Sequence, residues 1–230
     1  MRPTDLKGAV FFDFDGVLVD TEPIYFDTLN KLVVDTGKPP LTREEYGQFI
    51  GKPTSVTWRY LAGRYGFQDS IDYQQSIYRD ILRDALQERM VLRDGTLAVF
   101  ESLEMNHLGS VLVTSGNREW TDYKLNLLGL ENHFDYVVTG DDVIAAKPSP
   151  EIYLLAASRS GFDIASSVAI EDSVSGIESS KMAGLFTIGL RTDLTSSFDL
   201  SLADMLIDKL DEIDFISILG MIESKQMVKR

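Results

Sequence analysis

Residues 8–20 read Gly-Ala-Val-Phe-Phe-Asp-Phe-Asp-Gly-Val-Leu-Val-Asp, a stretch in which an apolar run ends in two aspartates beside a glycine. The run from Ala9 to Phe12 is rich in residues that favour strands, and alternation along a strand puts Asp13 and Asp15 on the same side. Two crowded carboxylates repel each other, and the simplest compensation is a hard cation that prefers oxygen ligands, such as Mg2+. The alternative is a solvated, aspartate-rich turn, and this stretch alone does not decide between the two.

Three later stretches also place polar residues at the ends of predicted strands or at the start of a helix. Residues 111–113 form an apolar run that leads into Thr-Ser-Gly-Asn at 114–117, whose hydroxyls and backbone donors suit phosphate oxygens. Lys147 stands just before a predicted helix start at Pro-Ser-Pro. Residues 168–170 form another apolar run, which ends in Glu-Asp-Ser at 171–173. Each of these stretches alone is a weak signal.

In this order and spacing the four stretches resemble the four motifs of the haloacid dehalogenase superfamily, and the resemblance covers nearly the whole chain. Residues 13–22, Asp-Phe-Asp-Gly-Val-Leu-Val-Asp-Thr-Glu, are similar to its phosphatase and β-phosphoglucomutase-like subgroup. Residues 147–153 (Lys-Pro-Ser-Pro-Glu-Ile-Tyr) and 171–177 (Glu-Asp-Ser-Val-Ser-Gly-Ile) also look like that subgroup. The resemblance implies an α/β fold, with a doubly wound parallel-sheet (Rossmann-like) core and an inserted α-helical cap domain.

The composition narrows the class of protein. The 230 residues are 44% hydrophobic and 25% charged, which is ordinary for a soluble globular protein. A formal net charge of -14 argues against a nucleic acid or an anionic membrane surface as partner. There is no cysteine, so disulfides and thiolate zinc sites are excluded. No apolar run has the length of a secretory segment or a membrane span, and we expect a cytoplasmic protein.

The pattern of the chain predicts two parts. Residues 20–92 read as helices only and would form the cap domain, whereas residues 1–19 and 93–230 would form the Rossmann-like core, in which helices and strands alternate. Thr21 is the predicted N-cap of the first cap helix, and Thr42 opens a capping-box pattern with Glu45. We expect the polar tail, residues 223–230, to be frayed.

By this resemblance, Asp13 is the nucleophile, which passes through an aspartyl phosphate. Asp15 would protonate the leaving group and then activate water. Mg2+ would be held by a carboxylate of Asp13, the backbone carbonyl of Asp15 and a carboxylate of Asp172. Glu171 is an additional candidate for the metal; otherwise it is a strand-end acid that faces solvent.

The remaining candidate residues would bind the substrate. Ser115, together with Thr114 and backbone amides near Gly116, would donate to the phosphate. Lys147 would balance the charge of Asp13 and the phosphate, although an exposed lysine before a proline is the ordinary alternative. In the cap, the candidate substrate contacts are Glu22, Gly51 and Lys52.

Three functions follow from these residues, and a phosphatase is the first. It would hydrolyse a small phosphorylated metabolite, such as a sugar phosphate, with Mg2+ as cofactor. A phosphomutase is the second, but the position that carries a histidine in β-phosphoglucomutase falls on Tyr25. The segment directly after Gly51, Lys-Pro-Thr-Ser at 52–55, also has no arginine. A catalytically silent binding protein is the third, and the presence of all the motif carboxylates and Lys147 ranks it last. We expect no nucleic-acid or membrane partner, and a monomer.

Overall fold

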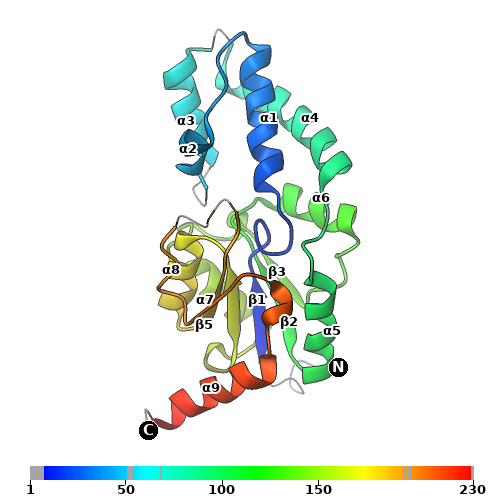
Figure 1. The fold of residues 1–230 in the computed structure, drawn as a ribbon, viewed down its shortest axis with the longest axis vertical. Coiled ribbons are helices and arrows are strands. Elements are labelled where there is room, and N and C mark those ends of the chain that lie inside the picture. Colours follow the sequence, from blue (N-terminus) through cyan, green and yellow to red (C-terminus); the bar gives the residue numbers. More distant parts are fainter. Residues whose placement is uncertain (1–7, 51–53, 68, 194, 196–197, 229–230) are drawn as a thin grey trace.

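The computed structural model describes residues 8–50, 54–67, 69–193, 195 and 198–228, with side chains described up to residue 224. Within this part of the chain, a parallel sheet and the helices around it form one body, and a group of helices stands above one end of the sheet (Figure 1). Figure 1 places these helices beyond the end of β1 at which the chain leaves the strand.

The sheet contains six described strands, all parallel, in the order β3-β2-β1-β4-β5-β6. The first strand lies in the middle, and the order reverses on either side of it, which is where ligands bind in doubly wound sheets. The strands are β1 (Ala9–Phe12), β2 (Gly109–Val113), β3 (Tyr136–Val138), β4 (Val168–Glu171), β5 (Phe186–Leu190) and β6 (Met205–Ile207).

Helices cover both faces of this sheet because its central strand is apolar on both sides. Val10 and Phe12 pack in one cluster with residues of three of these helices, α5, α6 and α9, whereas Phe11 packs in another cluster with α7. The α8 helix lies against α7 and β5. These helices are α5 (Thr96–Asn106), α6 (Arg118–Leu128), α7 (Glu151–Ser160), α8 (Val174–Ala183) and α9 (Phe215–Val228). The predicted α/β, doubly wound fold is thus confirmed.

The helices between β1 and β2 form a second group, here called the helical insertion. It consists of α1 (Glu22–Asp35), α2 (Arg43–Gly47), α3 (Thr54–Tyr65) and α4 (Ile71–Arg89). Its own apolar cluster is built from aromatic and aliphatic residues, among them Trp58 and Leu61. Leu82 and Leu86 of α4 belong instead to the cluster that covers the sheet. That the helical insertion is a domain of its own, over residues 20–92, stays a prediction.

The apolar runs at residues 9–12, 111–113 and 168–170 lie in β1, β2 and β4, and the capping box between Thr42 and Glu45 is present. Two details differ from expectation. Thr21 is the N-cap residue of α1, as predicted, but its side chain makes no capping hydrogen bond. The tail was expected to fray from residue 223, yet α9 continues to Val228. Its polar residues are good helix formers, and the Ser224 hydroxyl donates to the carbonyl of Gly220. Across the described residues, no helix has both the length and the apolar character needed to cross a membrane.

The packing of α4 on the sheet can be tested by truncation. Leu86 is fully buried in the cluster that contains the central strand, whereas Ile71 of the same helix is 40% exposed. We expect Leu86→Ala to lower the free energy of unfolding by about 2–5 kcal/mol, because it leaves a cavity. Ile71→Ala, the matched control, should cost clearly less. Urea denaturation measures both, and equal losses would contradict the packing described here.

Candidate functional site

Asp13, directly after β1, is bound by a buried lysine. The backbone N–H of Asp13 donates to the carbonyl of Ile170, and its Oδ1 accepts a hydrogen bond from Lys147 Nζ at 2.7 Å. The same ammonium donates to Glu171 Oε1 at 2.6 Å and to the carbonyl of Val113 at 3.0 Å. Lys147 therefore connects the ends of three strands, and the alternative of an exposed lysine is wrong, since its side chain is 3% exposed.

Three carboxylates gather around this lysine. Asp13, Glu171 and Asp172 are all buried, and each offers an oxygen within 4.8 Å of those of the other two. Tyr153 donates to Glu171 Oε1 at 2.5 Å, but Glu171 Oε2 is buried without a hydrogen-bond partner among the described residues. The alternative of a solvent-facing Glu171 is therefore wrong. An unpartnered buried oxygen in a group of carboxylates fits a divalent cation with oxygen ligands.

The pKa values of the cluster also favour a bound cation. Burial raises the pKa of the Asp13 carboxyl to about 7; Lys147 opposes this shift and Glu171 adds to it. Burial also raises the pKa of Asp172 well above its usual value, with help from Asp13 and Glu171. Burial alone would lower the pKa of Lys147, but its ion pairs with Asp13 and Glu171 raise it. One ammonium is thus too little positive charge for three carboxylates.

A glycine makes room for this cluster. Gly16 has φ +89°, and a Cβ at this position would lie 2.0 Å from Asp172 Oδ2. Both the backbone conformation and the contact exclude a side chain. The Asp-x-Asp-Gly sequence is therefore needed for packing as well as for its carboxylates.

Asp15 points to different partners from Asp13. Its two oxygens accept hydrogen bonds from Lys124 Nζ at 2.7 and 2.6 Å. Its Oδ1 also accepts from the hydroxyls of Thr21 at 2.7 Å and Tyr25 at 3.1 Å. The Thr21 hydroxyl, expected to cap α1, binds this carboxylate instead. The side chain of Asp15 is thus not a member of the three-carboxylate cluster, and a metal contact through its backbone carbonyl stays a prediction.

The predicted phosphate-binding residues follow β2. Thr114 is buried, and its hydroxyl accepts a hydrogen bond from the N–H of Gly116 at 3.1 Å. Ser115 is exposed. Asn117, rather than Ser115, caps α6 by accepting from the N–H of Trp120. Of these two hydroxyls, that of Thr114 is buried and stabilises the turn, whereas that of Ser115 is exposed.

Of the substrate contacts expected in the helical insertion, Glu22 can be placed. It lies at the start of α1, and its Oε2 accepts a hydrogen bond from the Tyr46 hydroxyl at 2.5 Å. Burial raises the pKa of Glu22 to about 7. The hydrogen bond from Tyr46 opposes this shift, whereas the negative charges of Asp15 and Asp20 add to it. Gly51 and Lys52 lie outside the described residues.

Sequence reasoning missed the partners of Asp15 and the tyrosine on Glu171. A signal existed for Lys124, because the inward face of α6 also carries Thr121 and Leu125, and a lysine on such a face needs a buried partner. Nothing in the sequence distinguished Tyr153 or Tyr25 from aromatic core residues.

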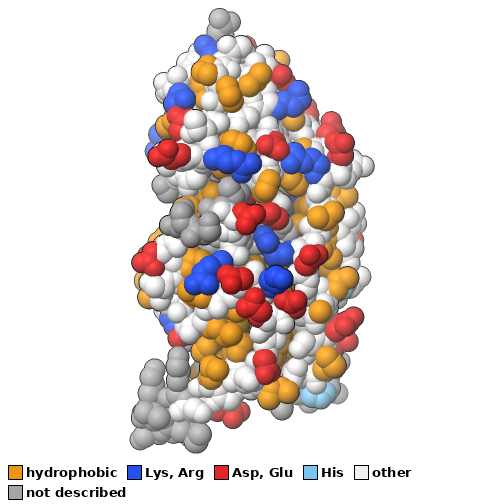
Figure 2. All heavy atoms as spheres, in the orientation of Figure 1, with side chains coloured by type: hydrophobic (Ala, Val, Ile, Leu, Met, Phe, Trp, Pro, Cys, Tyr) orange, Lys and Arg blue, Asp and Glu red, His pale blue; other side chains and the backbone are white. Residues whose placement is uncertain are grey.

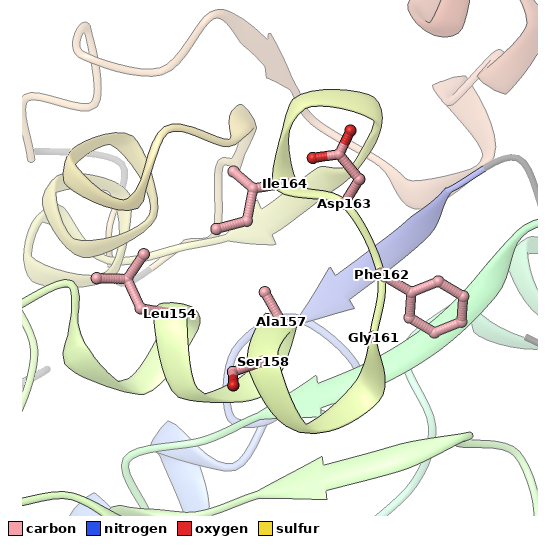
Figure 3. Close-up of a pocket in the computed structure, with 7 residues that line it drawn as sticks. All are labelled: Leu154, Ala157, Ser158, Gly161, Phe162, Asp163 and Ile164. Atoms are coloured by element: carbon pink, nitrogen blue, oxygen red, sulfur yellow. The ribbon is translucent and has the colours of Figure 1, made fainter.

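Charged side chains of both signs lie on the surface of the protein. In Figure 2 acidic and basic side chains lie next to each other across the middle of the face, at the level where the helical insertion meets the sheet in Figure 1. A separate hollow lies at the end of α7 and in the loop after it, and Leu154, Ala157, Phe162 and Ile164 are among its lining residues (Figure 3). It shares no residue with the carboxylate cluster, so the two are distinct features.

Comparisons with known proteins agree with this geometry. The model of the haloacid dehalogenase-like hydrolase family matches residues 10–190. A phosphorylated carbohydrates phosphatase of Thermotoga maritima is 33% identical over 177 residues, 77% of this chain and 82% of that protein. A validoxylamine A 7'-phosphate phosphatase of Streptomyces hygroscopicus is 29% identical, over 89% of this chain and 95% of its own length.

A solved structure supports the fold. The crystal structure of CbbY from Rhodobacter sphaeroides, in complex with xylulose-(1,5)bisphosphate, has a TM-score of 0.80 to this structure. The match covers 90% of this chain and 96% of that one, at 23% identity. At that identity the similarity concerns the fold.

The need for glycine at position 16 can be tested against a second glycine. Gly37 also has a positive φ, but a Cβ there would meet nothing within 4 Å. Gly37→Ala should therefore cost about 1 kcal/mol of stability from backbone strain alone. Gly16→Ala should cost clearly more, because it also displaces Asp172. Urea titrations measure the free energy of unfolding of both variants. Equal losses of stability would refute the close contact between position 16 and Asp172.

The raised pKa of Glu22 predicts a pH-dependent effect of Glu22→Gln. Its pKa rises from 4.5 to about 7 on folding, so the folded protein holds this proton more tightly than the unfolded chain. Its contribution to stability is therefore fully present below about pH 4.5 and is lost as the pH rises to about 7, at about 1.4 kcal/mol per unit of pKa difference.

Glutamine cannot ionise, and it can still accept the hydrogen bond from Tyr46. The stability of the variant relative to wild type should therefore be higher at pH 8 than at pH 5. Urea denaturation of both proteins at the two pH values measures this difference. The contributions of the other titrating groups cancel, because they are the same in the variant and in wild type. A difference that is the same at both pH values would contradict the raised pKa of Glu22.

Proposed function

Because this chain belongs to the haloacid dehalogenase-like hydrolases, and its named relatives include phosphatases, we propose that it is a Mg2+-dependent phosphatase of small phosphorylated metabolites, such as sugar phosphates. The observation that carries the proposal is the group of buried carboxylates around Lys147 at the carboxyl edge of the sheet, with the Asp15 carboxylate two residues after Asp13. This arrangement supplies a nucleophile, a proton donor and positive charge, the groups that hydrolysis of a phosphate monoester needs.

In this proposal Asp13 attacks phosphorus. Lys147 binds its Oδ1, which leaves Oδ2 for the attack. Asp15 enters this step protonated. A bond forms between Asp13 Oδ2 and phosphorus while the bond from phosphorus to the ester oxygen breaks, and the departing oxygen takes the proton of Asp15. Asp15 then removes a proton from water, which attacks the aspartyl phosphate and releases inorganic phosphate. Asp13 returns to its carboxylate form.

The phosphate and the cation would be held by neighbouring groups. We assign the phosphate contact first to the exposed hydroxyl of Ser115, because the hydroxyl of Thr114 and the N–H of Gly116 already bind each other. Asp13, Asp172 and Glu171 would hold Mg2+, with the backbone carbonyl of Asp15. The cation would offset the charge of the carboxylates and of the transferring phosphoryl group.

The helical insertion is proposed as the cap that selects the substrate, with Glu22 as its contact at the start of α1. Gly51 and Lys52 remain candidates from the sequence. The insertion lies above the carboxyl edge of the sheet in Figure 1, which is the position that such a role needs. A cytoplasmic location and a monomeric state remain predictions from the sequence.

The first experiment measures release of inorganic phosphate from a panel of phosphorylated metabolites, with and without Mg2+. We expect metal-dependent release, and we expect Asp13→Asn to reduce kcat by roughly 10⁴-fold because it removes the nucleophile. Asp35→Asn is the matched control, since Asp35 is exposed on α1 and pairs with Lys31. It should retain wild-type activity.

Two other outcomes would overturn the proposal. Isomerisation of a sugar phosphate in the presence of a bisphosphate activator, without net phosphate release, would establish a phosphomutase. No reaction with any substrate under either condition would identify a binding protein.

A further inference from the structure

Lys124 is a buried cation outside the motifs that define the site. It lies on α6, its side chain is 2% exposed, and its ammonium donates to both oxygens of Asp15. It also donates to the Tyr25 hydroxyl at 3.3 Å and lies 4.5 Å from the centroid of the Phe14 ring. All of these partners precede α6 by about a hundred residues, so the ion pair joins distant parts of the chain.

Burying the ammonium of Lys124 costs free energy unless an interaction in the protein compensates for it. An ammonium loses its hydration in the interior, and an ion pair with good geometry is needed to offset that loss. Apolar residues on the same face of α6 would fill the space at lower cost. The ion pair therefore needs another reason, and its partner is the proposed acid and base of the reaction.

The hydrogen bonds of Asp15 are divided unequally between its oxygens. Thr21, Tyr25 and Lys124 all donate to Oδ1, whereas Oδ2 accepts from Lys124. Oδ1 thus has three donors, whereas Oδ2 has one, the Lys124 ammonium. Oδ2 is therefore the oxygen that is available to exchange a proton with a leaving group or with water.

We infer that Lys124 is a positioning residue, which orients the Asp15 carboxyl so that Oδ2 faces the leaving group of the substrate. This inference rests on the proposed function. Without Lys124, Oδ1 keeps its two hydroxyl donors, but nothing described holds Oδ2, and the carboxyl can rotate about its Cβ–Cγ bond. Proton transfer needs the correct geometry first, so loss of the orientation reduces catalysis by Asp15.

The test uses two substrates that differ in their need for a proton. An alkyl phosphate, such as a sugar phosphate that the wild type accepts, has a basic leaving oxygen that must be protonated. The leaving group of p-nitrophenyl phosphate is stable as an anion and depends little on an acid. The ratio kcat/KM is compared because it reports the steps up to departure of the leaving group.

For Lys124→Met we expect kcat/KM to fall about 100-fold on the alkyl phosphate and less than about tenfold on p-nitrophenyl phosphate. Lys31→Met is the matched control, because Lys31 is an exposed lysine of α1, and it should change neither value. In an Asp15→Asn background, Lys124→Met should cause little further loss, because Lys124 acts through Asp15.

Equal losses on both substrates, no loss, or an independent loss in the Asp15→Asn background would overturn the role of Lys124. If Lys124→Met does not fold, Lys124→Gln keeps a neutral hydrogen-bond donor that is one bond shorter, and it should show a smaller loss with the same selectivity; an unselective loss overturns the inference. A wild type that hydrolyses neither ester refutes the proposed function itself, whereas an active wild type with an unchanged substrate ratio refutes the role of Lys124 alone.

Discussion

The structure depends on one electrostatic constraint, the burial of Asp13, Glu171 and Asp172 around a single ammonium. With all groups ionised, three carboxylates and one lysine leave a formal charge of -2 in a largely buried part of the protein. The raised pKa values of Asp13 and Asp172 express the cost of that charge. Either protons or a cation must supply the compensation, so the site is arranged to bind positive charge.

This constraint explains several features of the surrounding chain. The carboxylates come from two neighbouring strand ends, β1 and β4, and the carbonyl of β2 accepts a hydrogen bond from Lys147, which fixes the lysine between them. Gly16 has no side chain because Asp172 occupies the space where a Cβ would lie. Tyr153 supplies a hydroxyl to Glu171 from the other side. The sheet therefore provides a rigid base, and the polar groups at its edge depend on one another.

Much of this could be predicted from the sequence because local signals and the global fold agree. The apolar runs predicted the strands β1, β2 and β4, and the carboxylates and hydroxyls of the motifs lie at or just after the ends of these strands, as a doubly wound sheet requires. The failures have a common physical cause. Thr21 was read as a helix cap from its neighbours in the chain, but its partner is a carboxylate fixed by the fold. The face of α6 could have indicated that Lys124 is buried, but its partner lies 109 positions away, and local patterns do not identify such a partner.

The two aspartates of the first motif differ because each has a different cation. Asp15 and Lys124 form a pair whose formal charges cancel, so this pair by itself needs no further positive charge. Asp13 shares Lys147 with Glu171, and Asp172 has no lysine of its own at hydrogen-bond distance among the described residues. The uncompensated negative charge therefore belongs to the cluster of Asp13, Glu171 and Asp172, and a cation is needed there. A divalent ion there would cancel the remaining formal charge of -2 and leave Asp15 in its own neutral environment. Two carboxylates only two residues apart can in this way serve different chemical roles, because the helices and strands around them supply unequal positive charge.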